Sequence, residues 1–134
     1  MSAQIQLKNG QHLRTESGRV GILLAPYMFL WLDGNSHLQI NNNALTDTRL
    51  TLIKGSALIE IIEDSKKNRI EIEISGNCVH LDKELVYRSD LGPNRVTVHS
   101  GEAIVTRGTR KALVKGGKRI DLQDKLDVRK LDKE

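Results

Sequence analysis

Short runs in which apolar and polar residues alternate fill most of the chain, and they predict β-strands rather than helices. The clearest run is Arg69–Ser75, where three isoleucines alternate with two glutamates. Successive side chains of a strand point to opposite faces, so the isoleucines should face a core and the glutamates the solvent. The spacing between such runs is too short for helical crossovers, which favours a mostly antiparallel sheet.

One segment occurs twice. Residues 49–59 and 95–105 share Arg, Thr, Gly and Ala at the same positions, and aliphatic residues fill all but one of the other apolar positions. Two alternating runs around a glycine are typical of a strand, a tight turn and a second strand. We therefore expect Gly55 and Gly101 to occupy equivalent turns with positive φ.

Further strands are expected between turn-forming residues, and Asn41–Asn43 is expected to end one of them. Residues 124–134 could form a strand or a short helix, and the strand is favoured. The other expected strands are 13–16, 19–25, 28–32, 37–40, 79–81, 84–88, and short ones around Leu113 and 120–122. The prediction is one all-β domain over residues 1–134, either a two-layer sandwich or a rolled, solenoid-like stack of hairpins.

Composition supports this fold class. The chain has 134 residues, of which 38% are hydrophobic but only 3% aromatic, so the core should be built from Leu, Ile and Val. Eleven glycines stand against two prolines. This balance suits many short strands, because proline is excluded from the interior of sheets.

The aromatic residues gather in one strand. Tyr27, Phe29 and Trp31 alternate with Met28, Leu30 and Leu32, so both faces of this strand are apolar. Such a strand is either buried on both faces or leaves one face for a partner, and the buried alternative is favoured. Tryptophan is enriched in binding hot spots, so Trp31, with Tyr27 and Phe29, is the candidate partner contact.

The formal net charge is +4, and one stretch of the chain carries many cations and no acidic residue. Its basic residues are Arg107, Arg110, Lys111, Lys115, Lys118 and Arg119. The stretch could bind nucleic acid or another polyanion, or it could be the solvated face of edge strands. The second interpretation is favoured, because no aromatic residue for base stacking lies near it.

Residues able to do chemistry are few. Cys78 is the only cysteine, and in its strand it is expected to be a small buried hydrophobe. His80 lies on the same face, but no Asp or Asn is evident in the sequence that would orient this histidine for catalysis. The four histidines are dispersed without metal-ligand spacing. We therefore expect no catalytic residues, no metal, no cofactor and no small-molecule substrate.

No membrane span is expected. The longest apolar stretch, residues 22–32, is interrupted by Pro26 and falls short of the roughly 20 residues that a transmembrane helix needs. The first residues lack the basic head and apolar run of a signal peptide. A mature piece of a longer exported protein would have the same features.

Several segments, taken in order, resemble the FecR-type domain. Residues 17–26 resemble its Gly-Arg-x-x-x-x-Leu-x-Pro run, and residues 29–36 its Phe-Leu-Arg-Leu-Gly-x-Asn-Ser run. Residues 46–58, 85–88 and 96–103 resemble its later strands, so the resemblance covers about residues 13–122. Trp31 stands where the family commonly has arginine.

The resemblance implies a non-enzymatic, all-β module in the periplasm or elsewhere outside the cytoplasm, where it binds a protein in signalling. It does not include the membrane helix or the sigma-binding segment of the full regulators, so anti-sigma activity is not expected of this polypeptide by itself. Two alternatives stay open. One is a structural envelope subunit that self-associates through a sheet edge as a homo-oligomer, and the other, less favoured, is a polyanion-binding protein.

Overall fold

The computed structural model describes residues 9–25, 28–44, 47–61, 69–92, 94–122 and 126–130. This part of the chain is all-β, as predicted, and within it no helix is long and apolar enough to cross a membrane. The strands are β1 (His12–Arg14), β2 (Val20–Ala25), β3 (Met28–Leu32), β4 (His37–Ala44), β5 (Asp47–Lys54), β6 (Ser56–Ile61), β7 (Arg69–Ile74), β8 (Asn77–Asp90), β9 (Arg95–Arg107), β10 (Arg110–Lys115), β11 (Lys118–Leu122) and β12 (Leu126–Lys130).

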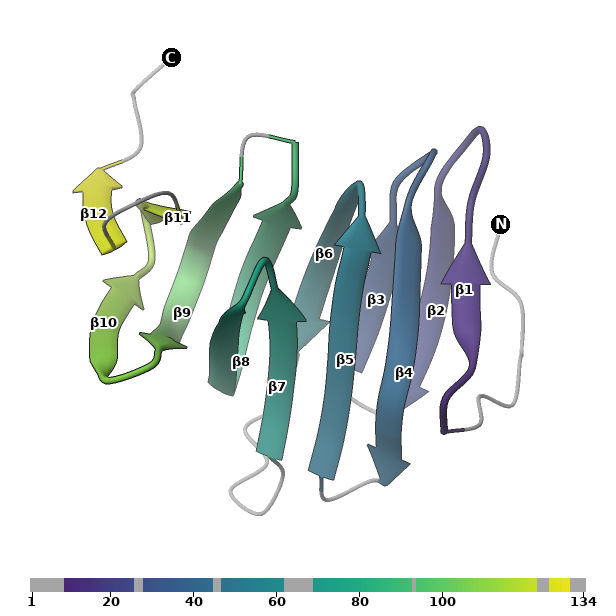
Figure 1. Cartoon of the computed structure of the whole chain (residues 1–134), viewed down its shortest axis with the longest axis horizontal. Coiled ribbons are helices and arrows are strands. Elements are labelled where there is room, and N and C mark those ends of the chain that lie inside the picture. The colour runs from purple at the N-terminus through teal and green to yellow at the C-terminus, as the bar shows by residue number, and fades with distance from the viewer. Residues whose placement is uncertain are drawn as a thin grey trace.

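The strands form one continuous sheet that curls into two layers (Figure 1). Layer A contains β1, β4, β5, β7, β10, the first half of β8 and the second half of β9. Layer B contains β2, β3, β6, β11, β12 and the remaining halves of β8 and β9. All strand pairs are antiparallel except β5 with β7, which confirms the predicted preference.

The long strands β8 and β9 join the layers. Residues 77–81 of β8 pair with β7 in layer A, and residues 85–90 pair with β6 in layer B. β9 runs beside β8 over both halves and pairs with β11 and then β10. Residues 79–81 and 84–88 were expected to be separate strands, but both belong to β8. The strand bends where it passes from layer A to layer B.

The repeated segment forms two such corners. Gly55 and Gly101 have φ of 83° and 85°, which confirms the expected positive φ at both. The expectation of a tight turn between paired strands is wrong, because β5 pairs with β4 and β7, whereas β6 pairs with β3 and β8. Gly55 lies between β5 and β6, next to Ser56, which pairs with Asp90 of β8. Gly101 follows Ser100, which pairs with Val86 of β8. The two corners therefore lie at opposite ends of the layer-B half of β8.

The core lies between the layers and is almost entirely aliphatic, as the composition predicts. Ile70, Ile72 and Ile74 are at most 5% exposed, so the inward face of β7 was predicted correctly. The expected end of a strand at Asn41–Asn43 is wrong, because β4 continues to Ala44. The register of its pairing with β5 shifts between Ile40 and Asn42, as at a β-bulge, and then continues to Ala44. The backbone hydrogen bonds to β5 outweigh the low strand propensity of asparagine.

Tyr87 is the exception in this core. Its side chain is fully buried and its hydroxyl is hydrogen-bonded to Ser89, which is also buried. Burial raises the pKa of Tyr87 above its ordinary value of 10.0, and the hydrogen bond to Ser89 offsets only part of this effect. The folded protein therefore holds Tyr87 neutral at a pH where the unfolded chain would ionise it.

This burial predicts loss of stability in alkali. The folded pKa is the higher one, so the stabilisation is complete below pH 10 and declines above it by about 1.4 kcal/mol per pH unit. Tyr87→Phe should remove that slope while costing about 1 kcal/mol at neutral pH through the lost hydrogen bond. Urea unfolding between pH 8 and 11 measures both. The Cys78→Ala background is the control, because the Cys78 thiol also has a raised pKa, of about 11. Equal slopes with Tyr and Phe would contradict the burial of a neutral Tyr87.

Candidate partner-binding face

The two apolar faces of β3 have different surroundings. Met28, Leu30 and Leu32 are at most 1% exposed in the core. Phe29 and Trp31 point to the other side of the strand, onto the outer face of layer B, where both are half-buried. The favoured prediction, burial in the core on both faces, does not describe this strand. Tyr27, the third predicted contact residue, lies outside the described residues.

Trp31 is held in a fixed position on this outer face. It is paired with Gly21 of β2, and a Cβ atom at Gly21 would come within 2.5 Å of Trp31 Cζ3 and 2.8 Å of Cε3. The indole therefore lies against the backbone of Gly21, which is buried beneath it. An aromatic ring across from a strand glycine covers the backbone that glycine leaves bare.

Neighbouring strands extend the apolar surface on both sides of Trp31. Strand pairing places Leu23 beside Phe29 and Leu58 beside Trp31. Val86 lies two strands away from Phe29, with Glu60 between them, and is a diagonal neighbour of Leu58. All five apolar residues alternate with core residues and so face outward, and Leu23 is 55% exposed. We call this set the apolar stripe: Leu23, Phe29, Trp31, Leu58 and Val86. Exposed apolar side chains gathered on the outside of a sheet are typical of a contact face.

Ion pairs border the apolar stripe along one side. Asp33 accepts hydrogen bonds from Arg19 (3.1 Å) and Arg88 (2.6 Å). Arg88 also donates to Asp90 at 3.0 Å, and Asp90 accepts from Ser56 at 2.6 Å. Partial burial lowers the pKa of Arg88, but the hydrogen bonds and charges of Asp33 and Asp90 outweigh this and raise it. These ion pairs hold the side chain of Arg88, which is paired with Leu58 across β6 and β8, and they give the apolar stripe a polar rim.

The apolar stripe reaches an open sheet edge. Within the part of the chain that the structure describes, β2 pairs only with β3, and its other side carries no neighbouring strand. Backbone groups on such an edge can pair with a strand of another chain. Side-chain contact and strand addition are therefore both available on this face of the molecule.

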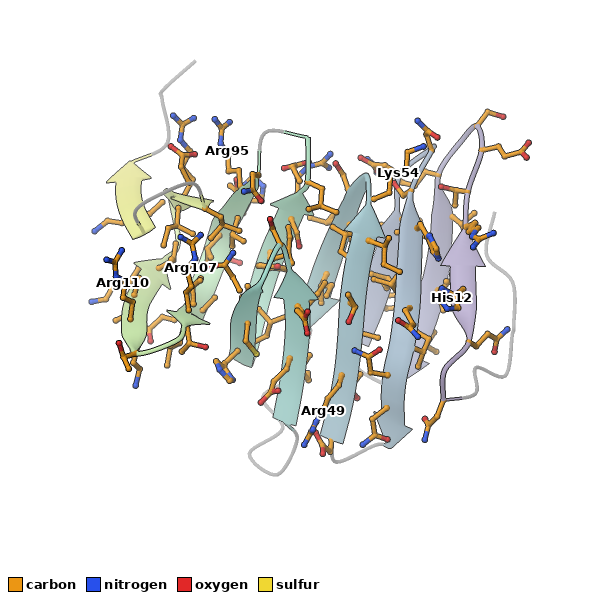
Figure 2. All side chains as sticks on the ribbon, viewed as in Figure 1. His12, Arg49, Lys54, Arg95, Arg107 and Arg110 are labelled. Carbon is orange, nitrogen blue, oxygen red and sulfur yellow. The ribbon has the colours of Figure 1, made fainter. Side chains whose placement is uncertain are left out.

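The predicted basic patch is divided among different surfaces. Arg107 serves the fold, since it donates to Asn77 Oδ1 (2.7 Å) and to the Leu122 carbonyl oxygen (2.6 Å). Lys111 and Lys115 face outward on β10 in layer A, whereas Arg119 faces outward on β11 in layer B. The remaining two, Arg110 and Lys118, lie at the ends of these strands. Figure 2 shows Arg110 beside β10, away from Arg95. The six cations do not share one face.

The outer face of layer A is polar and contains Cys78. Cys78 is half-buried there rather than in the core, and its thiol lies 3.8 Å from Glu71 Oε2. Burial, followed by the charge and hydrogen bond of Glu71, raises the pKa of the thiol to about 11. A protonated thiol is a poor nucleophile, so the Cys78–His80 pair has no activated sulfur in this arrangement.

Sequence reasoning missed Glu71 in this group. Glu71 is paired directly with His80 across β7 and β8, and its Oε1 lies 3.3 Å from His80 Nδ1. It also missed that His12 Nδ1 lies 2.7 Å from His37 Nε2, across β1 and β4. The pKa of His37 is lowered, first by desolvation and then by the positive charges of Arg14 and His12. Both contacts join residues on different strands, so only the strand register could have disclosed them.

Comparisons with known proteins give a likeness of fold. No protein-family model matches the chain, and no curated protein matches it. Two crystal structures from Parabacteroides distasonis ATCC 8503, each described as a "putative anti-sigma factor", match with a TM-score of 0.74. Their sequence identity is 9% and 10%, and the match covers 91% of this chain but 60% of that chain. The chain therefore has the fold of about three-fifths of each of these longer chains.

Proposed function

We propose that this chain is a non-enzymatic protein-interaction module of FecR type that acts in signalling outside the cytoplasm. The observation that carries the proposal is the apolar stripe around Trp31, bordered by the Asp33–Arg88–Asp90 ion pairs. The resemblance of the sequence to FecR-type domains supports it. So does the fold likeness to structures described as a "putative anti-sigma factor".

The arrangement suits a protein partner better than a small ligand. The stripe crosses β2, β3, β6 and β8 on the outside of the sheet, where a partner surface can lie against it. Trp31 is already ordered against Gly21, so little side-chain entropy would be lost when a partner covers it. Tryptophan at the centre and charged groups at the rim follow the usual anatomy of interfaces.

Self-association is the second candidate, and the open edge of β2 favours it. Two copies could pair their β2 strands and so join their sheets edge to edge, with the Leu23 side chains of the two copies on the shared outer face. Polyanion binding has no comparable support, because Lys111 and Lys115 lie on the outer face of layer A and Arg119 on that of layer B.

Photo-crosslinking in the producing cell tests the proposal. A photoreactive amino acid at Leu23 (55% exposed) samples the layer-B face, and one at Ile53 (44%) or Leu113 (48%) samples the layer-A face. We expect a discrete adduct with another protein from position 23 and none from the two controls. An adduct twice the mass of the chain would identify self-association instead. Equal labelling from all three positions would contradict a specific contact face.

A further inference from the structure

Three different metal-binding side chains converge on the outer face of layer A. Glu71 projects from β7, and Cys78 and His80 project from β8 on the same side of the sheet. Their donor atoms all lie within 4.8 Å of one another. A carboxylate, a thiol and an imidazole are the three side-chain types that bind zinc in proteins.

The distances approach those of a coordination sphere. Two ligands on one tetrahedral zinc ion lie about 3.3 to 3.6 Å apart, given bonds of about 2.0 to 2.3 Å. Glu71 Oε1 is 3.3 Å from His80 Nδ1, and Glu71 Oε2 is 3.8 Å from Cys78 Sγ. These distances run to the two different oxygens of Glu71, and the donor atoms lie within 4.8 Å of one another, so the side chains must rotate to share one ion. Strand pairing already holds all three backbones in place.

The surroundings suit a bound cation. Thr106 Oγ1 lies 3.4 Å from His80 Nε2, so it can accept a hydrogen bond from that nitrogen and orient the ring with Nδ1 toward Glu71. Glu73 lies directly across from Cys78 and adds negative charge. Arg49 is nearby, but it is paired with Asp47 through hydrogen bonds of 3.1 and 3.0 Å.

We propose that Glu71, Cys78 and His80 form a binding site for a zinc-class divalent transition-metal ion. The ion would take one carboxylate oxygen, Nδ1 of the neutral imidazole and the Cys78 thiolate, whose proton is released to solvent. Three protein ligands leave a fourth position, which water or a donor group from outside the chain would fill. The site lies on the opposite outer face from the apolar stripe, so it can be tested independently of the partner-binding proposal.

Cobalt(II) is the probe, because its thiolate complexes have a charge-transfer band in the near ultraviolet. Titration of the reduced full chain should produce that band and saturate at one equivalent. Cys78→Ser should abolish the band, and Glu71→Gln and His80→Ala should each weaken binding by about tenfold or more. His12→Ala is the matched control, since it removes a histidine of the other pair on the same layer.

Folding is monitored by circular dichroism, and zinc should raise the melting temperature of the wild type but not of Cys78→Ser. Absence of the cobalt band in the wild type would overturn the proposal. So would a band that Glu71→Gln and His80→Ala leave unchanged, because the thiol would then bind the metal alone. A loss of binding in His12→Ala equal to that in His80→Ala would place the metal at the His12–His37 pair and would also overturn it.

Discussion

Gly55→Ala should lower the free energy of unfolding by about 2–5 kcal/mol. Gly55 has φ of 83°, which costs an alanine roughly 1–2 kcal/mol. A Cβ atom there would also overlap Ser36 Oγ and come within 2.7 Å of Ser36 Cα. The backbone at Ser36 or at residue 55 itself must therefore move. Overpacking of this kind typically adds about 1–3 kcal/mol. Urea unfolding of the two proteins measures the difference.

Gly76→Ala is the matched control for this prediction. Gly76 has φ of 78°, but a Cβ atom added there would meet nothing within 4 Å. It should therefore show only the conformational cost, about 1–2 kcal/mol. Equal losses for the two variants would mean that the Gly55 corner does not pack against Ser36.

Leu30→Ala should lower the free energy of unfolding by about 2–5 kcal/mol, because Leu30 is 0% exposed between the layers and its loss leaves a cavity. Phe29→Ala, one residue away, should cost less than half as much, since Phe29 is half-buried on the outer face. Denaturant midpoints of the two variants test which face of β3 belongs to the core. Equal losses would mean that both faces are buried, as the sequence alone favoured.

Local pattern was sufficient to predict the strands but not their arrangement. Strict alternation identified the inward face of β7, and the internal repeat predicted positive φ at Gly55 and Gly101. The same pattern could not tell a hairpin turn from a corner, because both need a glycine between two alternating runs. The difference depends on which strands are neighbours, and those neighbours are distant in sequence.

The candidate sites depended on register in the same way. Trp31 and Phe29 could be singled out by residue type, but their outward direction follows from the pairing of β3 with β2 and β6. Glu71, Cys78 and His80 come together only because β7 and β8 pair with Glu71 opposite His80. A basic stretch continuous in sequence is divided in space because β10 and β11 lie in different layers.

Fluorescence of Trp31 tests the central claim most directly, because Trp31 is the only tryptophan of the chain and lies within the apolar stripe. We expect its emission and its quenching by acrylamide to be independent of protein concentration in the isolated chain. Addition of the partner captured at position 23 should shift the emission to shorter wavelength and reduce quenching. Unchanged emission and quenching with that partner bound would contradict the assignment of this face to protein binding.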